Sequence, residues 1–305
     1  MNTIKDLQIK KANMLFLELP ELILKPPHKK EIQQVPLEYS TLSSKHQKKV
    51  NKFLATTQPD FSYSRINDTL LTLSIKSIPK TKKYQGNYDI EGNAIRIEKN
   101  SDAIYHELFH AFTRYNTKMN MGTGFFRTLK TLDIEVGDGL NEGYTDLLSK
   151  QYFDSPISEA FTSNIALKTE MIIGKEKMHH YYDHNDLQQV ITYLSSLSSK
   201  EEAKRFILGL DKLYNYTDSS QKGLTLWATL STYLTHLYIK QLEIQYKIEG
   251  LPQGEIANRL DSFKENFTKY TLKNKQLKKQ YLTSNDYQEI QTSLTYHTFT
   301  KQLHR

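Results

Sequence analysis

The chain of 305 residues contains no cysteine. Its fold therefore depends on no disulfide bond, and any metal ion that it binds has no thiolate ligand. The absence of cysteine fits a protein from a reducing compartment. At this length the chain can bury a substantial core without disulfides, in one large domain or two modest ones.

Long hydrophobic runs are also absent. The most hydrophobic stretch, residues 224–244, is interrupted by polar residues such as His236 and Lys240, so no segment reaches the roughly 18 apolar residues of a membrane-spanning helix. An apolar stretch near the N-terminus, residues 14–24, contains two glutamates and a proline, and no small-residue cleavage site follows it. We therefore expect a soluble, cytoplasmic protein with no signal peptide and no membrane partner.

Positive charge is in modest excess, with a formal net charge of +7. The lysines are interspersed with asparagine, glutamine and threonine, and the densest group, residues 273–281, has the pattern of a solvated helix face. No helix-turn-helix pattern is evident. A nucleic acid is therefore not the expected partner, although a regulatory peptidase acting on a nucleic-acid-bound protein is an alternative. The pattern predicts no particular oligomeric state.

Hydrophobic periodicity predicts an α+β fold in three parts. A helical segment over residues 1–60, with a break at Pro26–Pro27, precedes a core over residues 61–150 that contains a small mixed or antiparallel sheet. Residues 151–305 form a mainly helical C-terminal half, in which no proline follows Pro252. The helices expected in this half span residues 157–173, 186–197, 200–214, 224–248 and 254–281.

Strand patterns are confined to the predicted core. Residues 69–78 alternate enough to predict a strand, and residues 86–97 predict a hairpin with its turn at residues 91–93. Ser101 then has the position of a helix N-cap, and Asp102 that of an acid in the first turn. The hairpin is therefore expected to lead directly into a helix.

That helix carries the segment His106-Glu107-Leu108-Phe109-His110. Residues four apart on a helix differ by about 40° in direction and about 6 Å in height, so the two imidazoles project toward one point and can hold one divalent cation. Glu107 is turned by about 100° from His106, which places its carboxylate beside the open position of the metal. The pattern is typical of a zinc site with a glutamate as general base.

A third ligand is required, because catalytic zinc typically has three protein ligands. Thr113 and Asn116 occupy the positions where the longer pattern H-E-x-x-H-x-x-G-x-x-H has Gly and His, so the third ligand lies elsewhere. A second predicted helix carries Glu142 and Asp146 on one face, so one can bind the metal while the other accepts a proton from a ligand imidazole. The alternative ligands lie in the irregular stretch before that helix and are Asp133, Glu135 and Asp138.

The two segments resemble the active-site helices of the gluzincin metallopeptidases, the thermolysin-like zinc peptidases, with H-E-x-x-H on one helix and N-E-x-x-x-D on the next. The resemblance covers roughly residues 84–150 and implies a zincin-like core that hydrolyses peptide bonds in a peptide or protein with a metal-activated water. The Zn2+ ligands that it implies are His106, His110 and Glu142. It also implies Glu107 as the catalytic base and Asp146 as the carboxylate that orients His106.

Two further expectations concern the substrate. In the family resembled, the strand before the metal helix is an edge strand that pairs with an extended peptide, which implies this role for residues 93–98; an ordinary hairpin with a covered edge is the alternative. Hydrolysis also needs a hydrogen-bond donor for the developing oxyanion. The candidates lie in residues 178–184 and are Tyr181, Tyr182, His180 and His184, unless this segment is a polar helix edge without a chemical role.

The same residues would also fit a protein of another class. In a non-catalytic interaction protein, the metal would be a structural clip and the helical half would bind a partner. A structural site is closed by protein ligands, whereas a catalytic site keeps a position for water. Glu107 favours the enzyme, because a clip has no use for that carboxylate.

Overall fold

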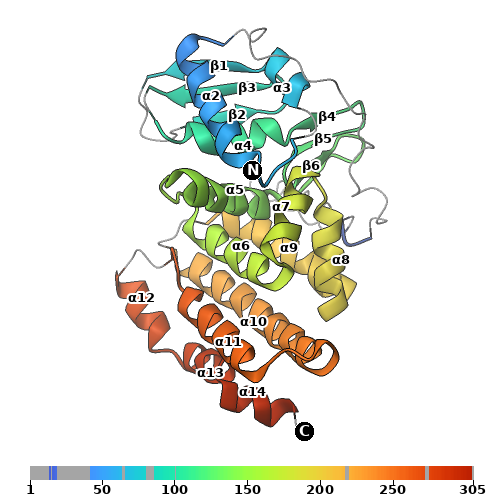
Figure 1. Ribbon diagram of the computed structural model, residues 1–305, viewed down its shortest axis with the longest axis vertical. Helices are drawn as coiled ribbons and strands as arrows, with labels where there is room; N and C mark the ends of the chain where they lie inside the picture. Colours follow the sequence, from blue (N-terminus) through green and yellow to red (C-terminus); the bar gives the residue numbers. More distant parts are fainter. Residues whose placement is uncertain are drawn as a thin grey trace, which may run out of the picture.

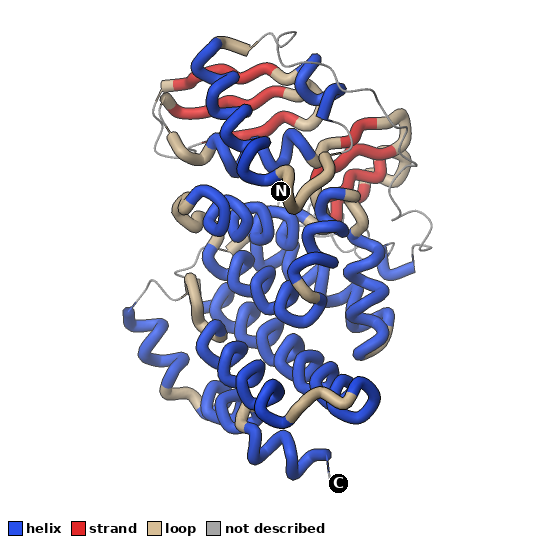
Figure 2. Tube along the Cα trace, in the orientation of Figure 1, coloured by secondary structure: helices blue, strands red, loops and turns tan. Residues whose placement is uncertain are grey.

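The computed structural model shows an α+β protein in which two small sheets precede a helical C-terminal half (Figures 1 and 2). This confirms the predicted class, while the zincin-like character and the division into three parts stay predictions. Most of the predicted N-terminal helical segment, including Pro26–Pro27, lies outside the described residues. The described residues are 14, 16–18, 42–63, 66–79, 86–99, 101–216, 220–271 and 275–303.

The first sheet has three strands in the order β1–β3–β2. β1 (Ser74–Ile78) pairs parallel to β3 (Ala94–Glu98), and β2 (Gly86–Asp89) pairs antiparallel to β3. The predicted hairpin of β2 and β3 is confirmed. The prediction of an edge strand at residues 93–98 is wrong, because β1 covers the side of β3 that the hairpin leaves open. Of the two hairpin strands, β2 is the one at the edge of the described sheet.

The strand expected over residues 69–78 is divided between a helix and a strand. α3 (Ile66–Thr72) takes the first part and β1 the second. Leu70 is buried, and the hydroxyl of Thr69 donates a hydrogen bond to the carbonyl oxygen of Ala111 at 3.3 Å. Residues 69–72 are therefore helical where they pack on the helix that contains Ala111, although their sequence pattern favours a strand.

The two predicted metal helices are present. α4 (Ile104–Phe112) packs against β2 and β3, and α5 (Asp138–Phe153) lies between α4 and the helices of the C-terminal half (Figure 1). Ser101 was expected to cap the first of them. Instead its hydroxyl accepts a hydrogen bond from the N–H of Ala103 in a turn before the helix, so the helix begins later than predicted.

A second sheet fills the segment between these helices, where the sequence pattern indicated only an irregular stretch. It is antiparallel, with the strand order β4–β5–β6–β7. The strands are β4 (Tyr115–Asn116), β5 (Asn120–Thr123), β6 (Phe126–Leu129) and β7 (Ile134–Val136). Each has between 2 and 4 residues, too few for a recognisable alternation.

Helices make up the described C-terminal half. They are α6 (Ala160–Ile173), α7 (Lys175–Asp183), α8 (Leu187–Leu197), α9 (Lys200–Tyr214), α10 (Gln221–Glu249), α11 (Gln253–Asn266), α12 (Lys275–Leu282), α13 (Asn285–Ser293) and α14 (Tyr296–Leu303). The expected helices are confirmed apart from residues 254–281, which are divided between α11 and α12. No helix within the described ranges combines the length and apolar character that a bilayer crossing requires.

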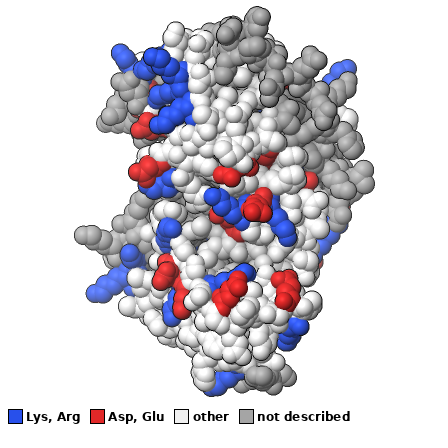
Figure 3. All heavy atoms as spheres, in the orientation of Figure 1, with Lys and Arg blue, Asp and Glu red and all other residues white. Residues whose placement is uncertain are grey.

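The described part of the N-terminal segment is mainly α2 (Ser44–Thr57), capped by the hydroxyl of Ser43. Its Phe53 packs edge-on against Phe109 of α4, with ring centroids 4.8 Å apart. On the face in Figure 3, basic and acidic side chains alternate over the helical half, and a group of basic side chains lies over the end of the molecule that holds α2.

Candidate metal centre

Three of the predicted ligand side chains lie together. One ligand atom from each of His106, His110 and Glu142 lies within 4.8 Å of the others, and the described residues contain no second such group of histidine and acidic side chains. Nε2 of His106 is 2.9 Å from Nε2 of His110 and 3.2 Å from Oε2 of Glu142. The alternative ligands are not part of the group; they are Asp133, Glu135 and Asp138.

The donor set fits a divalent cation. Two imidazole nitrogens that face each other at 2.9 Å need a proton or a cation between their lone pairs. Oε1 of Glu142 lies 3.2 Å from Nε2 of His110, so a carboxylate completes the group. Two imidazoles and one carboxylate suit zinc and several other divalent ions. The group can therefore hold a metal ion, and its geometry alone does not identify the metal.

Asp146 fixes the first histidine. Its Oδ1 lies 2.9 Å from Nδ1 of His106, and its Oδ2 accepts hydrogen bonds from the N–H of Ser158 at 2.9 Å and of Glu159 at 2.7 Å. A neutral His106 then carries its proton on Nδ1 and directs the lone pair of Nε2 at the other ligands. The carboxylate therefore holds both the orientation and the tautomer that metal binding needs.

Electrostatic interactions within the group favour its ionised form. Burial lowers the pKa of His106, but the hydrogen bonds and charges of Asp146 and Glu142 outweigh it and raise the pKa well above its usual value. Burial raises the pKa of Glu142, and the two histidines more than reverse this, so its pKa lies well below the usual value. A metal ion must displace the proton that His106 holds, so metal affinity falls as the pH is lowered.

Glu107 lies beside the ligands on the same helix and is buried, with 7% of its surface exposed. Burial raises the pKa of its carboxyl, as suits a general base, and the positive charges of His106 and His110 lower it only in part. A Cβ atom added to Gly86 of β2 would lie 2.7 Å from Oε1 of Glu107. The bare backbone of β2 therefore leaves the space that this carboxylate occupies.

The two predicted tyrosines have their hydrogen-bond and ring partners outside the ligand group. Tyr182 is fully buried, and its hydroxyl is 2.7 Å from the hydroxyl of Thr145 on α5. Tyr181 is half-buried, and its ring meets the edge of the His180 ring. His180 in turn stacks on His184, with centroids 4.0 Å apart. Burial raises the pKa of Tyr182, and the negative charge of Glu142 raises it further. The role of these side chains as oxyanion donors stays a prediction.

Tyr214 was not foreseen as a site residue. Burial raises the pKa of its phenol, and the negative charges of Glu142 and Asp138 raise it further. Its neighbourhood follows from the packing of α9 on α5, and nothing in the local sequence indicates it. Tyr214 is therefore a third phenol, after Tyr181 and Tyr182, to consider as a hydrogen-bond donor.

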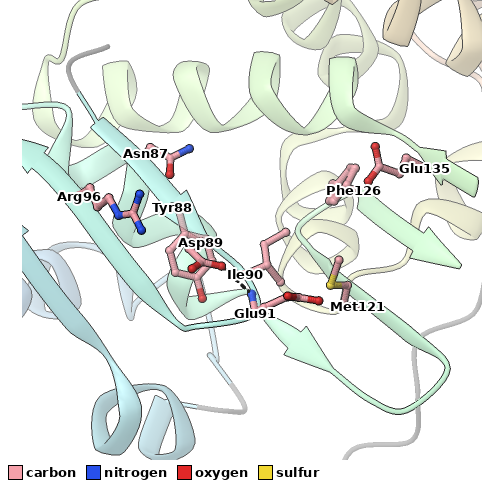
Figure 4. A pocket seen from close by; sticks show the side chains of 9 residues that line it. All are labelled: Asn87, Tyr88, Asp89, Ile90, Glu91, Arg96, Met121, Phe126 and Glu135. Atoms are coloured by element: carbon pink, nitrogen blue, oxygen red, sulfur yellow. Dashed lines mark hydrogen bonds between the residues drawn. The ribbon is translucent and has the colours of Figure 1, made fainter. Parts of the chain in front are cut away.

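A cavity of about 380 Å3 lies between β2 and the second sheet (Figure 4). The ring of Tyr88 is parallel to that of His110, with centroids 6.4 Å apart, so the cavity adjoins the ligand group. Apolar, polar and charged side chains all line it. The lining residues are Asn87, Tyr88, Asp89, Ile90, Glu91, Arg96, Met121, Phe126 and Glu135.

Comparisons of the chain with protein-family models, with curated proteins and with solved structures give no match. The support for a function is therefore the geometry of the ligand group and of the cavity beside it.

Proposed function

We propose that the protein is a metal-dependent peptidase of the gluzincin type, with zinc as the first metal to test. The observation that carries the proposal is the buried Glu107 next to a group of three ligands. Three protein ligands are typical of catalytic zinc, whereas structural zinc sites usually have four. The ligands in question are His106, His110 and Glu142, which form the group.

The residues of this chain supply defined parts of a hydrolysis. A bound zinc ion would acidify a water molecule and polarise the substrate carbonyl. Glu107, with its raised pKa, takes the proton from the water and passes it to the leaving amine. Asp146 keeps the Nδ1 proton of His106 in place through the 2.9 Å contact.

The proposed substrate is an extended peptide along β2. Among the described residues this strand is an edge of its sheet, so its outward backbone groups can form main-chain hydrogen bonds with a peptide. The cavity follows the same edge, and Phe126 and Met121 of the second sheet line its other wall (Figure 4). A peptide paired with β2 would pass Tyr88 and reach the ligand group at His110.

The decisive variant is Glu107→Gln. We expect it to keep its metal and to lose at least about a hundredfold in turnover, because a positioned general base typically contributes about that much or more. The measurements are metal analysis and cleavage of a peptide library, with and without a chelator. Glu176→Gln, on α7, is the matched control and should retain wild-type activity.

Two results would count against the peptidase. Unchanged cleavage by the Glu107→Gln variant would remove the proposed base. A wild-type protein that binds zinc and cleaves no peptide would favour the alternative of a metal-clipped interaction protein.

A further inference from the structure

A carboxylate on α9, that of Asp211, connects the helical half to α5, the helix that carries Glu142. Asp211 accepts a hydrogen bond from the N–H of Gly137 at 3.0 Å and one from the N–H of Gly139 at 2.9 Å. Both groups belong to the N-terminal turn of α5, whose own N-cap residue offers no side chain. The side chain that caps α5 therefore belongs to a residue that lies 74 positions after Gly137 and 72 positions after Gly139.

The backbone of α5 lies unusually close to those of α9 and α6. A Cβ atom on Gly139 would lie 2.2 Å from the carbonyl oxygen of Leu210 in α9, and one on Gly143 would lie 2.5 Å from that of Thr162 in α6. These glycines are four residues apart and share a face of α5. Glu142 is in the same turn as Gly143, so the seating of this face sets the position of its carboxylate.

Asp211 is half-buried, and both of its contacts with α5 are partly shielded from solvent. Burial raises the pKa of its carboxyl to about 6, while the backbone hydrogen bonds from α5 lower it in part. The carboxylate does not belong to the ligand group. Asp211 therefore does not touch the metal, and its hydrogen bonds connect it to the site through the position of α5.

We propose that Asp211 is a positioning residue of the metal centre. By capping α5 from α9, it holds Glu142 at the right distance from the two histidines of α4. The histidines share one helix, so their spacing is local, whereas the third ligand is correctly placed only if α5 is correctly seated. The inference rests on the proposed metal site and extends it into the helical half.

The test compares the zinc affinity of full-length variants by competition with a chromophoric chelator. Asp211→Ala removes both acceptors, and we expect the zinc dissociation constant to rise about tenfold, as for other residues that support metal ligands. Asp211→Asn keeps one amide oxygen as acceptor and should have an affinity between those of the wild type and the alanine variant.

The matched control is Ser199→Ala. Ser199 caps α9 itself, at the end of the helix opposite to Asp211, with its hydroxyl 3.2 Å from the N–H of Glu202. Its loss should lower the melting temperature while leaving zinc affinity within about twofold, since a lost N-cap costs about 1 kcal/mol of stability. Melting curves of all variants show how much of any effect is general destabilisation.

Equal losses of affinity in Asp211→Ala and Ser199→Ala would overturn the proposal, as would wild-type affinity in a folded Asp211→Ala protein. If that variant does not fold, wild-type affinity in Asp211→Asn would overturn it. A wild type that binds zinc without cleaving peptides would refute the proposed function and leave this test intact. A wild type with no zinc affinity would refute both.

Discussion

At the residue scale, the ligands differ in what holds them. His106 is fixed by Asp146, and the amide nitrogen of Asn141 lies 3.3 Å from Nδ1 of His110. Glu142 makes its contacts with these same groups, the two imidazoles and the Asn141 amide. Its carboxylate is thus directed toward the two imidazoles and the space that a shared cation would take.

Replacing Glu142 with alanine should therefore weaken zinc binding more than the loss of a supporting residue, which typically costs about ten- to a hundredfold. The measurement is the zinc dissociation constant at neutral pH. Glu135→Ala is the control, because Glu135 lies on β7 outside the ligand group. Full affinity in the Glu142 variant, with a loss in the control, would return the third ligand to the stretch before α5.

At the scale of elements, the spacing between β2 and α4 sets the position of Glu107, the proposed general base. Ile97 of β3 and Glu107 of α4 both crowd the position of Gly86, with atoms 2.7 Å from an added Cβ. Only a glycine leaves room there for both side chains, and the backbone of β2 consequently lies directly beside the carboxylate. The strand that we propose to pair with substrate is thus also a wall of the catalytic pocket.

Gly86→Ala should consequently displace Glu107 and lower turnover while leaving zinc affinity close to that of the wild type. Because the added methyl group overpacks this site, we also expect the variant to lose about 1–3 kcal/mol of folding stability. Comparison of kcat, zinc affinity and melting temperature separates these effects. Gly254→Ala is a suitable control, since no atom lies within 4 Å of its added Cβ. Unaltered turnover in a folded Gly86→Ala protein would disprove this role of the strand.

At the scale of the whole molecule, α7 joins the two halves. His179 stacks on Phe61 with centroids 4.7 Å apart, and Asp183 accepts hydrogen bonds from the N–H groups of Ser62 and Tyr63. Nε2 of His179 is buried without a hydrogen-bond partner among the described residues. Burial, and then the charge of Lys175, lower the pKa of His179 to about 4.

This histidine should make folding stability depend on pH. The unfolded state binds a proton below a pKa of about 6.5, whereas the folded state does so only near 4, so stability is lost as the pH falls between these values. From pH 7.5 to pH 5, we expect the wild type to lose about 2 kcal/mol more than His179→Gln in denaturant unfolding. His236→Gln, at an exposed position of α10, should lose as much as the wild type. Identical losses in the wild type and the His179 variant would exclude the effect.

Local signals account for the parts that sequence patterns predicted well. The helix expected over residues 200–214 coincides with α9, because Ser199 and Glu202 form a capping box in front of an amphipathic pattern. Patterns failed where strands are very short and where a strand pairs with one that does not follow it directly in the chain. The strands of the second sheet are too short to show a period, and β1 reaches the open side of β3 only in the folded molecule.

The sequence by itself determined the convergence of His106 and His110, because the geometry of one helix places side chains four residues apart on one side. It also named Glu142 as the leading third ligand, through the resemblance of its segment. Only the tertiary structure decided that this carboxylate meets the imidazoles, that β2 is the strand edge beside them, and that Asp211 caps α5. Each of these contacts joins separate elements, and the burial of their shared surfaces, which no local pattern encodes, fixes them.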